Sequence, residues 1–322
     1  MSQLLESRVA YKPFNYPWAY EAFKVHEQAH WLPEEAPLNE DVNDWKNKLT
    51  EQEKSLLTHI FRFFTQGDID VAGAYIEKYL PVFKQPEVRM MLLSFAAREA
   101  IHIDAYSKII ETLGMPDTTY SQFLEYDAMK NKHDYVQRYI DHTNKKTIAQ
   151  QIAVFSAFTE GMQLFSSFIM LLNFTRRGLM KGMGQIITWS IIDESMHCEG
   201  MTTLFRTFIE ENPHIWTDEF KKTLYQIARD MVELEDKFID LAYELGEVDG
   251  LTAEEVKEYI RYIADRRLMA LGLKPNWEVE RNPLPWVNEL LSLDPHENFF
   301  ETRATSYAKG ALTGSWSDVW AV

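Results

Sequence analysis

The chain has 322 residues and a formal net charge of −16, from 33 basic and 49 acidic side chains. This acidic balance argues against a broad nucleic-acid surface, which requires clustered Lys and Arg. Hydrophobic residues make up 46% of the chain, enough to bury a large core, so wholesale disorder is excluded. A single cysteine, Cys198, excludes an internal disulfide framework and a Cys-rich metal site.

Neither a membrane span nor a signal peptide is expected. The most apolar stretch, residues 164–173, is shorter than the roughly 20 residues that a membrane-spanning helix needs. The N-terminal residues do not show a basic segment followed by an apolar one. The sequence therefore predicts a soluble protein of the cytoplasm that contacts neither membrane nor nucleic acid.

Helical periodicity dominates the chain, and alternating strand patterns are hard to find, so an all-α fold is predicted. The first 45 residues are rich in Pro and Trp and are expected to form an irregular arm. Capping-box patterns begin helices at Thr50 and Thr252. Helices are expected over residues 50–80, 86–113, from about 118, and over 145–177, 180–208, 217–245 and 252–271. The predicted organisation is an N-terminal arm (1–45), a helical domain (46–300) and a C-terminal tail (301–322), with residues 282–286 not forming a regular helix.

The motif Glu-x-x-His places a carboxylate and an imidazole on one face of a helix, where both can bind one metal ion. It occurs four times, as Glu27/His30, Glu99/His102, Glu194/His197 and Glu211/His214. The first pair lies in the polar arm and the last contains a proline, so neither is expected to bind metal. The two middle pairs lie in strongly apolar helices, and either one alone is also consistent with a hydrogen-bonded core pair.

An acid in apolar surroundings precedes each of the two middle pairs. Asp68 lies 31 residues before Glu99, and Glu160 lies 34 residues before Glu194. At about 1.5 Å per residue, this spacing suits one helix, a turn and a return to the same level. Asp70 competes with Asp68, but two residues apart on a helix differ by about 200°, and Asp70 is expected at the surface.

Two such helix pairs can close into a ferritin-like four-helix bundle with six inward ligands. Four acids and two histidines are the ligand set of di-iron and di-manganese carboxylate proteins, because oxygen and imidazole ligands suit these metals. Paired core acids without a metal are the alternative interpretation. The predicted ligands are Asp68, Glu99, His102, Glu160, Glu194 and His197.

With these residues in place, the sequence resembles the small, radical-generating subunit of class I ribonucleotide reductase. Tyr106 follows the second motif at the position of the family's radical-storing tyrosine. Trp31, in the stretch Trp-Leu-Pro-Glu-Glu, and Asp193 match the family's electron-transfer tryptophan and the aspartate that joins it to a metal-bound histidine. Residues 282–286 resemble a segment near the end of the family's fold, and Tyr307 falls where a tail tyrosine relays the radical.

The resemblance implies a subunit of ribonucleoside-diphosphate reductase, an oxidoreductase that converts ribonucleotides to deoxyribonucleotides. It implies a homodimer whose C-terminal tail docks on a separate, catalytic large subunit. The presence of Tyr106 favours a di-iron, tyrosyl-radical form, with a dimanganese or mixed Mn/Fe pair as alternatives. Leu164 and Phe168 are expected to line a dry pocket around the Tyr106 ring.

Two other functions use the same ligands. A stand-alone di-metal oxidase or oxygenase acting on an apolar substrate predicts an open tunnel to the metals. A ferritin-like storage or structural bundle predicts no protein radical. The combination of Tyr106, Trp31 and Tyr307 favours the reductase subunit over both.

Overall fold

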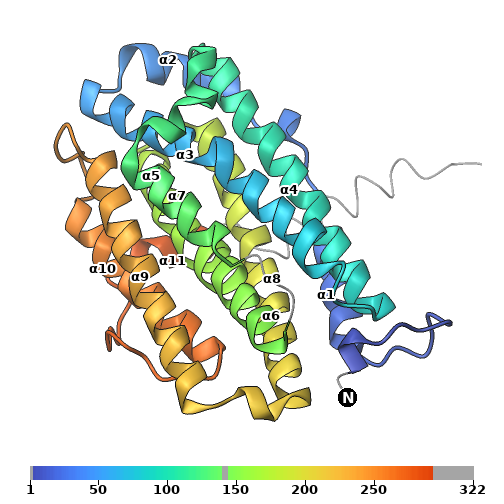
Figure 1. The fold of residues 1–322 in the computed structure, drawn as a ribbon. Coiled ribbons are helices and arrows are strands. Elements are labelled where there is room, and N and C mark those ends of the chain that lie inside the picture. Colours follow the sequence, from blue (N-terminus) through green and yellow to red (C-terminus); the bar gives the residue numbers. More distant parts are fainter. Residues whose placement is uncertain (1–2, 140–143, 293–322) are drawn as a thin grey trace, which may run out of the picture. The chain divides into compact units, whose positions relative to one another are not determined.

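The computed structural model describes residues 3–139 and 144–292 of the chain (Figure 1). The chain divides into two compact units, residues 1–284 and 285–322, and only helix α11 is described of the second. The α-helices are α1 (Pro17–Gln28), α2 (Leu38–Asn47), α3 (Glu51–Gly73), α4 (Pro86–Leu113), α5 (Asp127–Gln137), α6 (Lys145–Ile152), α7 (Leu164–Arg176), α8 (Lys181–Glu211), α9 (Asp218–Ala242), α10 (Ala253–Ala270) and α11 (Pro285–Ser292). Two π-helical segments, η3 (Ala74–Tyr79) and η6 (Ala153–Gln163), continue α3 and join α6 to α7. The predicted all-α fold is confirmed.

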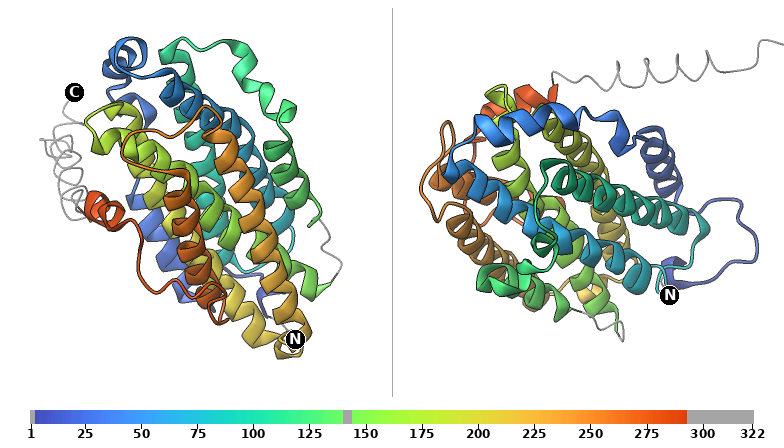
Figure 2. Two further views of the ribbon diagram at one scale, coloured as in Figure 1. Left: turned by 90° about the vertical axis from the view of Figure 1, so that its left-hand side faces the viewer. Right: turned by 90° about the horizontal axis from the view of Figure 1, so that it is seen from above.

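The first unit is built around two long helix pairs. Helix α3 packs on α4, and the continuous rod α6–η6–α7 packs on α8, while α4 and α8 also contact each other. Helices α9 and α10 cover the rod on the side of the bundle away from α1 (Figures 1 and 2). The arrangement is the predicted four-helix bundle, with extra helices on its outside.

The rod that spans Lys145–Arg176 is the most apolar helix of the described chain. By length and composition it is able to cross a membrane, but its whole apolar window is buried inside the protein. The short apolar stretch recognised in the sequence is thus one part of a 32-residue helix. The rod is therefore the core helix of the bundle.

The N-terminal arm is more regular than predicted, because α1 and α2 are helices. Pro17 opens α1, a position where its missing N–H costs nothing. In α2, the Asp41 carboxylate accepts hydrogen bonds from the backbone N–H of Gly182 and Met183 at 2.9 and 2.6 Å. These are orphan donors at the start of α8. The arm therefore closes the N-terminus of a ligand-bearing helix.

Helix boundaries elsewhere follow the sequence signals closely. Thr50 and Glu53 form the predicted capping box, with hydrogen bonds of 3.2 and 2.8 Å. Gly114 ends α4 in the left-handed conformation, with φ of 70°. Two departures occur: residues 117–125 form short 3₁₀ turns before α5, and Pro285 begins α11 inside the segment expected to be irregular.

Candidate metal centre

Four helical elements bring the six predicted ligands to the middle of the bundle. Asp68 comes from α3, Glu160 from η6, and one Glu-x-x-His pair from each of α4 and α8. All six side chains are at most 1% exposed. Because the helices of each pair run antiparallel, Asp68 and Glu160 lie at the same height along the bundle as the motif on the partner helix. The spacings of 31 and 34 residues predict this arrangement.

The two imidazoles lie among the carboxylates. Nδ1 of His102 is 3.4 Å from Glu99 and 3.2 Å from Glu194. Nδ1 of His197 is 3.1 Å from Glu99, 3.3 Å from Glu160 and 3.5 Å from Glu194. One compact group, with ligand atoms all within 4.8 Å of one another, comprises Glu99, Glu160, Glu194 and His197.

The polar atoms that lack hydrogen bonds show how a metal pair would fit. Both oxygens of Glu99 and of Glu194 are buried without a hydrogen-bond partner among the described residues. The same holds for single atoms of the other four side chains, namely Asp68 Oδ2, Glu160 Oε2, His102 Nδ1 and His197 Nδ1. Buried polar atoms without hydrogen bonds are costly, so eight converging ones fit a site built for cations. Glu99 and Glu194 would each offer two oxygens to a bound pair of ions.

The pKa shifts in the cluster also fit a site for cations. Burial and the neighbouring Glu99 raise the pKa of Asp68 well above its ordinary value. Burial raises the pKa of Glu160 to about 7. Burial alone would lower the pKa of His197, but the surrounding carboxylates, first that of Glu160, raise it well above its ordinary value. Protons thus balance charge in the cluster, and cations that bind there must displace them.

Nε2 of His102, the nitrogen opposite Nδ1, is hydrogen-bonded to Asp193. His102 Nε2 lies 3.2 Å from an oxygen of Asp193. Because the ionised carboxylate only accepts hydrogen bonds, Nε2 is the donor and Nδ1 keeps its lone pair for a metal ion.

His197 has a corresponding partner in the N-terminal arm. Its Nε2 lies 3.1 Å from Nε2 of His26, and His26 Nδ1 lies 2.6 Å from the Ser94 hydroxyl. The Ser94 hydroxyl donates its proton to Glu27, so it can only accept from Nδ1 of His26. With its proton on Nδ1, the neutral His26 must accept at Nε2 the hydrogen bond from His197. Burial lowers the pKa of His26 to about 2, which keeps it neutral in this chain. Nδ1 of His197 is therefore the nitrogen that would bind a metal ion, once the ion has displaced its proton.

Comparison with known proteins decides the family. A family model described as ribonucleotide reductase, small chain, matches residues 8–283. The chain belongs to the ribonucleotide reductase small-chain family.

Individual relatives agree with this assignment. A probable ribonucleoside-diphosphate reductase small subunit of Invertebrate iridescent virus 3 is 52% identical, over 98% of this chain and 88% of the viral protein. The ribonucleoside-diphosphate reductase subunit beta of Chlamydia pneumoniae is 30% identical, over 92% and 88%. The ribonucleotide reductase R2 subunit from Clostridium botulinum superposes with a TM-score of 0.81 at 26% identity, covering 88% of this chain and 91% of that one.

This chain is accordingly a ribonucleotide reductase small subunit, an oxidoreductase component with a ferritin-like fold. The family carries a di-metal site, works with a large subunit and is typically dimeric. Small subunits of this kind are soluble. The stand-alone oxidase and the storage bundle are not favoured by these relationships.

Tyr106 of the small subunit lies one helical turn after His102, with ring centroids 6.2 Å apart. Its ring is 4% exposed and stacks on Phe64 at 4.5 Å, and Phe64 in turn packs against Phe168 at 5.8 Å. Burial raises the pKa of the Tyr106 phenol well above its ordinary value, so the hydroxyl stays protonated. Tyr106 therefore lies in a buried environment beside Phe64, and the lining role predicted for Leu164 and Phe168 stays a prediction.

Trp31 and Asp193 meet as the resemblance predicts. The indole N–H of Trp31 donates to Asp193 at 2.8 Å, on the same carboxylate oxygen that faces His102. The Trp31 and His102 rings are stacked at 5.9 Å. Arg98 donates to the second Asp193 oxygen at 2.8 Å and to the backbone carbonyl of Ala29 at 2.9 Å, which ties the arm to the bundle.

The remaining predicted residues lie apart from this cluster or outside the described chain. Asp70 is half-buried rather than exposed as predicted, and it pairs with His133 at 2.6 Å. His30 is exposed at the end of α1. Tyr307 and the tail 301–322 lie outside the described residues.

Sequence reasoning missed two side chains that hydrogen-bond to the ligands. Tyr75 donates a hydrogen bond to Glu160 at 2.7 Å, and its position seven residues after Asp68, on the same helix face, is a signal that could have revealed it. His26 lies 171 residues from His197 in sequence, and no local pattern marks it.

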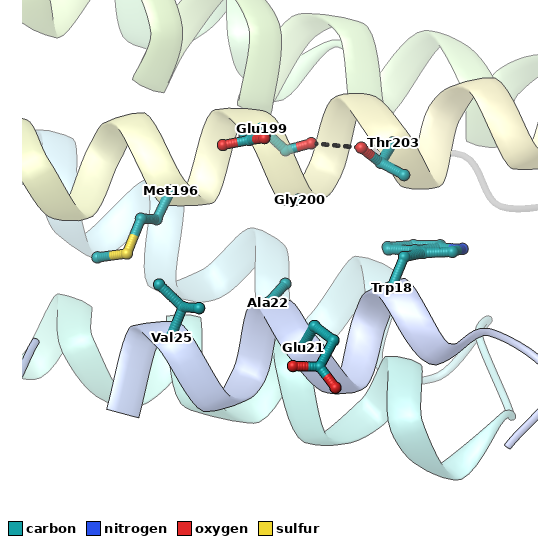
Figure 3. Close-up of a pocket in the computed structure, with 8 residues that line it drawn as sticks. All are labelled: Trp18, Glu21, Ala22, Val25, Met196, Glu199, Gly200 and Thr203. Atoms are coloured by element: carbon teal, nitrogen blue, oxygen red, sulfur yellow. Dashed lines mark hydrogen bonds between the residues drawn. The ribbon is translucent and has the colours of Figure 1, made fainter. Parts of the chain in front are cut away.

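A surface groove of about 290 Å³ runs between α1 and α8 (Figure 3). Val25 and Met196 line it, whereas their chain neighbours His26 and His197 lie buried on the inner side. None of the six predicted ligands lines this groove, so it is not the open tunnel that an oxidase would need.

Proposed function

We propose that this small subunit binds two metal ions through the six predicted ligands and stores a radical oxidant at Tyr106. The convergence of eight ligand atoms without hydrogen bonds in one buried cluster supports this role. We propose iron as the native metal, with a dimanganese or mixed Mn/Fe pair as the alternatives, because oxygen and imidazole ligands suit both metals.

The bound metals supply the one-electron oxidising power that protein side chains lack. Tyr106 is the side chain placed to be oxidised, since it lies one turn from His102 and is shielded by Phe64. Its phenol is protonated, so loss of an electron is accompanied by loss of the hydroxyl proton. Exclusion of water from its pocket protects the stored radical.

The stored oxidant then leaves through Asp193 and Trp31 toward the large subunit. The hydrogen bonds from His102 and Trp31 to one Asp193 oxygen form a continuous contact from the metal centre to the arm. Tyr307 is the proposed last relay residue. The large subunit binds the ribonucleotide and uses the delivered oxidant to reduce it to the deoxyribonucleotide.

We further propose that the protein acts as a homodimer in the cytoplasm and that residues 301–322 dock on the large subunit. In this organisation residues 1–45 form the arm that carries Trp31, and residues 46–300 form the metal-binding domain.

Electron paramagnetic resonance (EPR) tests the radical assignment. Metal-loaded protein exposed to oxygen and frozen is expected to show a tyrosyl signal that Tyr106→Phe abolishes. Tyr79→Phe is a matched control, because Tyr79 is also buried but donates to the backbone carbonyl of Gln151. A fully loaded wild type without a tyrosyl or high-valent metal signal would contradict the proposal, as would a signal that survives Tyr106→Phe.

The tail has a separate test. Deleting the residues after Phe300 is expected to leave metal binding intact and to abolish turnover with the large subunit. Turnover that survives the deletion would show that docking and relay do not depend on Tyr307.

A further inference from the structure

Tyr75 is a buried phenol in direct contact with a predicted ligand. The side chain is 0% exposed, and its hydroxyl donates a 2.7 Å hydrogen bond to Oε1 of Glu160. Its ring packs edge-on against His197 at 5.9 Å and against Tyr79 at 5.6 Å. Tyr75 thus lies on the His197 side of the cluster, whereas Tyr106 contacts the His102 side.

Both partners of this hydrogen bond sit in π-helical segments. Tyr75 lies in η3 and Glu160 in η6. In η3 the backbone N–H of Leu80 donates to the carbonyl of Tyr75, five residues back, at 3.0 Å. Such segments are rare inside helices and occur frequently at functional sites, because the wider turn changes which side chains face inward. Two separate departures from α-helical geometry therefore place the phenol opposite the carboxylate.

The two oxygens of Glu160 differ in their hydrogen bonding. Oε1 is engaged by Tyr75, while Oε2 is buried without a hydrogen-bond partner among the described residues. Glu99 and Glu194 differ in that both of their oxygens lack such a partner. Oε1 also lies 3.3 Å from Nδ1 of His197, so the Tyr75 hydrogen bond fixes the oxygen of Glu160 that faces this imidazole.

We propose that Tyr75 is a positioning residue of the metal centre, which fixes the orientation of the Glu160 carboxylate beside His197. This inference rests on the proposed function, because it takes the six ligands as given. Partners of metal ligands orient them and contribute to affinity, typically by about 10- to 100-fold. A phenol that only filled core space would contribute to stability and leave metal binding unchanged.

Metal titration of Tyr75→Phe separates these roles. Full-length, metal-free protein is titrated anaerobically with Mn²⁺, and the EPR signal of free Mn²⁺ gives the number and affinity of bound ions. The wild type is expected to bind two ions per chain. In Tyr75→Phe, one of the two is expected to bind about 10- to 100-fold more weakly, and the spectrum of the loaded protein should change.

Tyr79→Phe is the matched control. It removes a hydroxyl of equal burial one turn away, which donates to a backbone carbonyl at 3.2 Å. It is expected to retain both affinities and the wild-type spectrum. Wild-type binding by Tyr75→Phe, or equal weakening in the two variants, would overturn the proposal.

A crystal structure of the Mn²⁺-loaded wild type decides the matter even if Tyr75→Phe does not fold. The proposal requires the Tyr75 hydroxyl to stay hydrogen-bonded to Glu160 in the loaded protein, with Glu160 bound to metal. Metal-bound Glu160 that has turned away from the Tyr75 hydroxyl would overturn it. A wild type that binds no Mn²⁺ would instead refute the ligand set itself, so the two failures are distinguishable.

Discussion

Asp193→Asn is expected to destabilise the metal-free protein by about 3 kcal/mol. Burial alone would raise the pKa of Asp193, but the hydrogen bond from His102 and the charge of Arg98 outweigh it and lower the pKa to about 2. Relative to the ordinary value of 3.8, this shift corresponds to roughly 2.5 kcal/mol. Asparagine keeps the shape but not the charge, which leaves the Arg98 guanidinium, 5% exposed, without its counter-ion.

The sign of the pH dependence follows from the same shift. A carboxyl group whose pKa is lower in the folded state stabilises that state above its unfolded pKa. The contribution of Asp193 is therefore complete above about pH 4 and is lost as the pH falls toward about 2. The difference between wild type and variant should be constant from about pH 5 to 8.

Urea unfolding in the presence of a chelator, followed by circular dichroism, measures the effect. Asp104→Asn is the matched control on the neighbouring helix α4, because Asp104 pairs with Lys108 at the surface and should be dispensable. Adding Arg98→Met to Asp193→Asn should recover part of the loss, since it removes the unpaired charge. Unfolding of Asp193→Asn at the wild-type urea midpoint would refute this reasoning.

Three further results are expected. Gly161→Ala should lower stability by about 1–3 kcal/mol in a thermal melt, because its Cβ would lie 2.7 Å from Arg267 Nε; an unchanged melt would contradict this packing. Lys132→Met should lower the free energy of unfolding in urea by about 3–5 kcal/mol, because it leaves the buried Glu235 without its counter-ion. Adding Glu235→Gln should restore much of this stability, and no recovery would count against the ion pair. Affinity for Mn²⁺ should rise as the pH increases through about 7, where Glu160 loses its proton, and a titration with a pH-independent affinity would contradict the proton competition.

The helix pairs and the ligand cluster could be predicted because their geometry is local. A helix rises by a fixed amount per residue, so spacings of 31 and 34 residues bring Asp68 and Glu160 level with the two motifs. The choice between Asp68 and Asp70 followed from the angle between neighbouring positions, and the structure places Asp70 on His133. The capping boxes were equally visible, since each is a four-residue pattern.

Contacts made by the arm could not be predicted in the same way. His26 meets His197 across 171 residues, and Asp41 meets Gly182 across 141. Such contacts depend on how helices pack, which periodicity alone does not determine. The π-helical segments η3 and η6 were also invisible, because a shift in backbone hydrogen bonding leaves no clear mark in the sequence.

Anomalous X-ray diffraction from crystals of the full chain grown with Mn²⁺ tests whether six side chains hold two ions inside this bundle. Two peaks per chain are expected, one within bonding distance of Nδ1 of His102 and the other within bonding distance of Nδ1 of His197. Glu99 and Glu194 are expected to contact both ions. A single peak, or peaks away from these nitrogens, would contradict the di-metal centre and remove the source of the proposed radical.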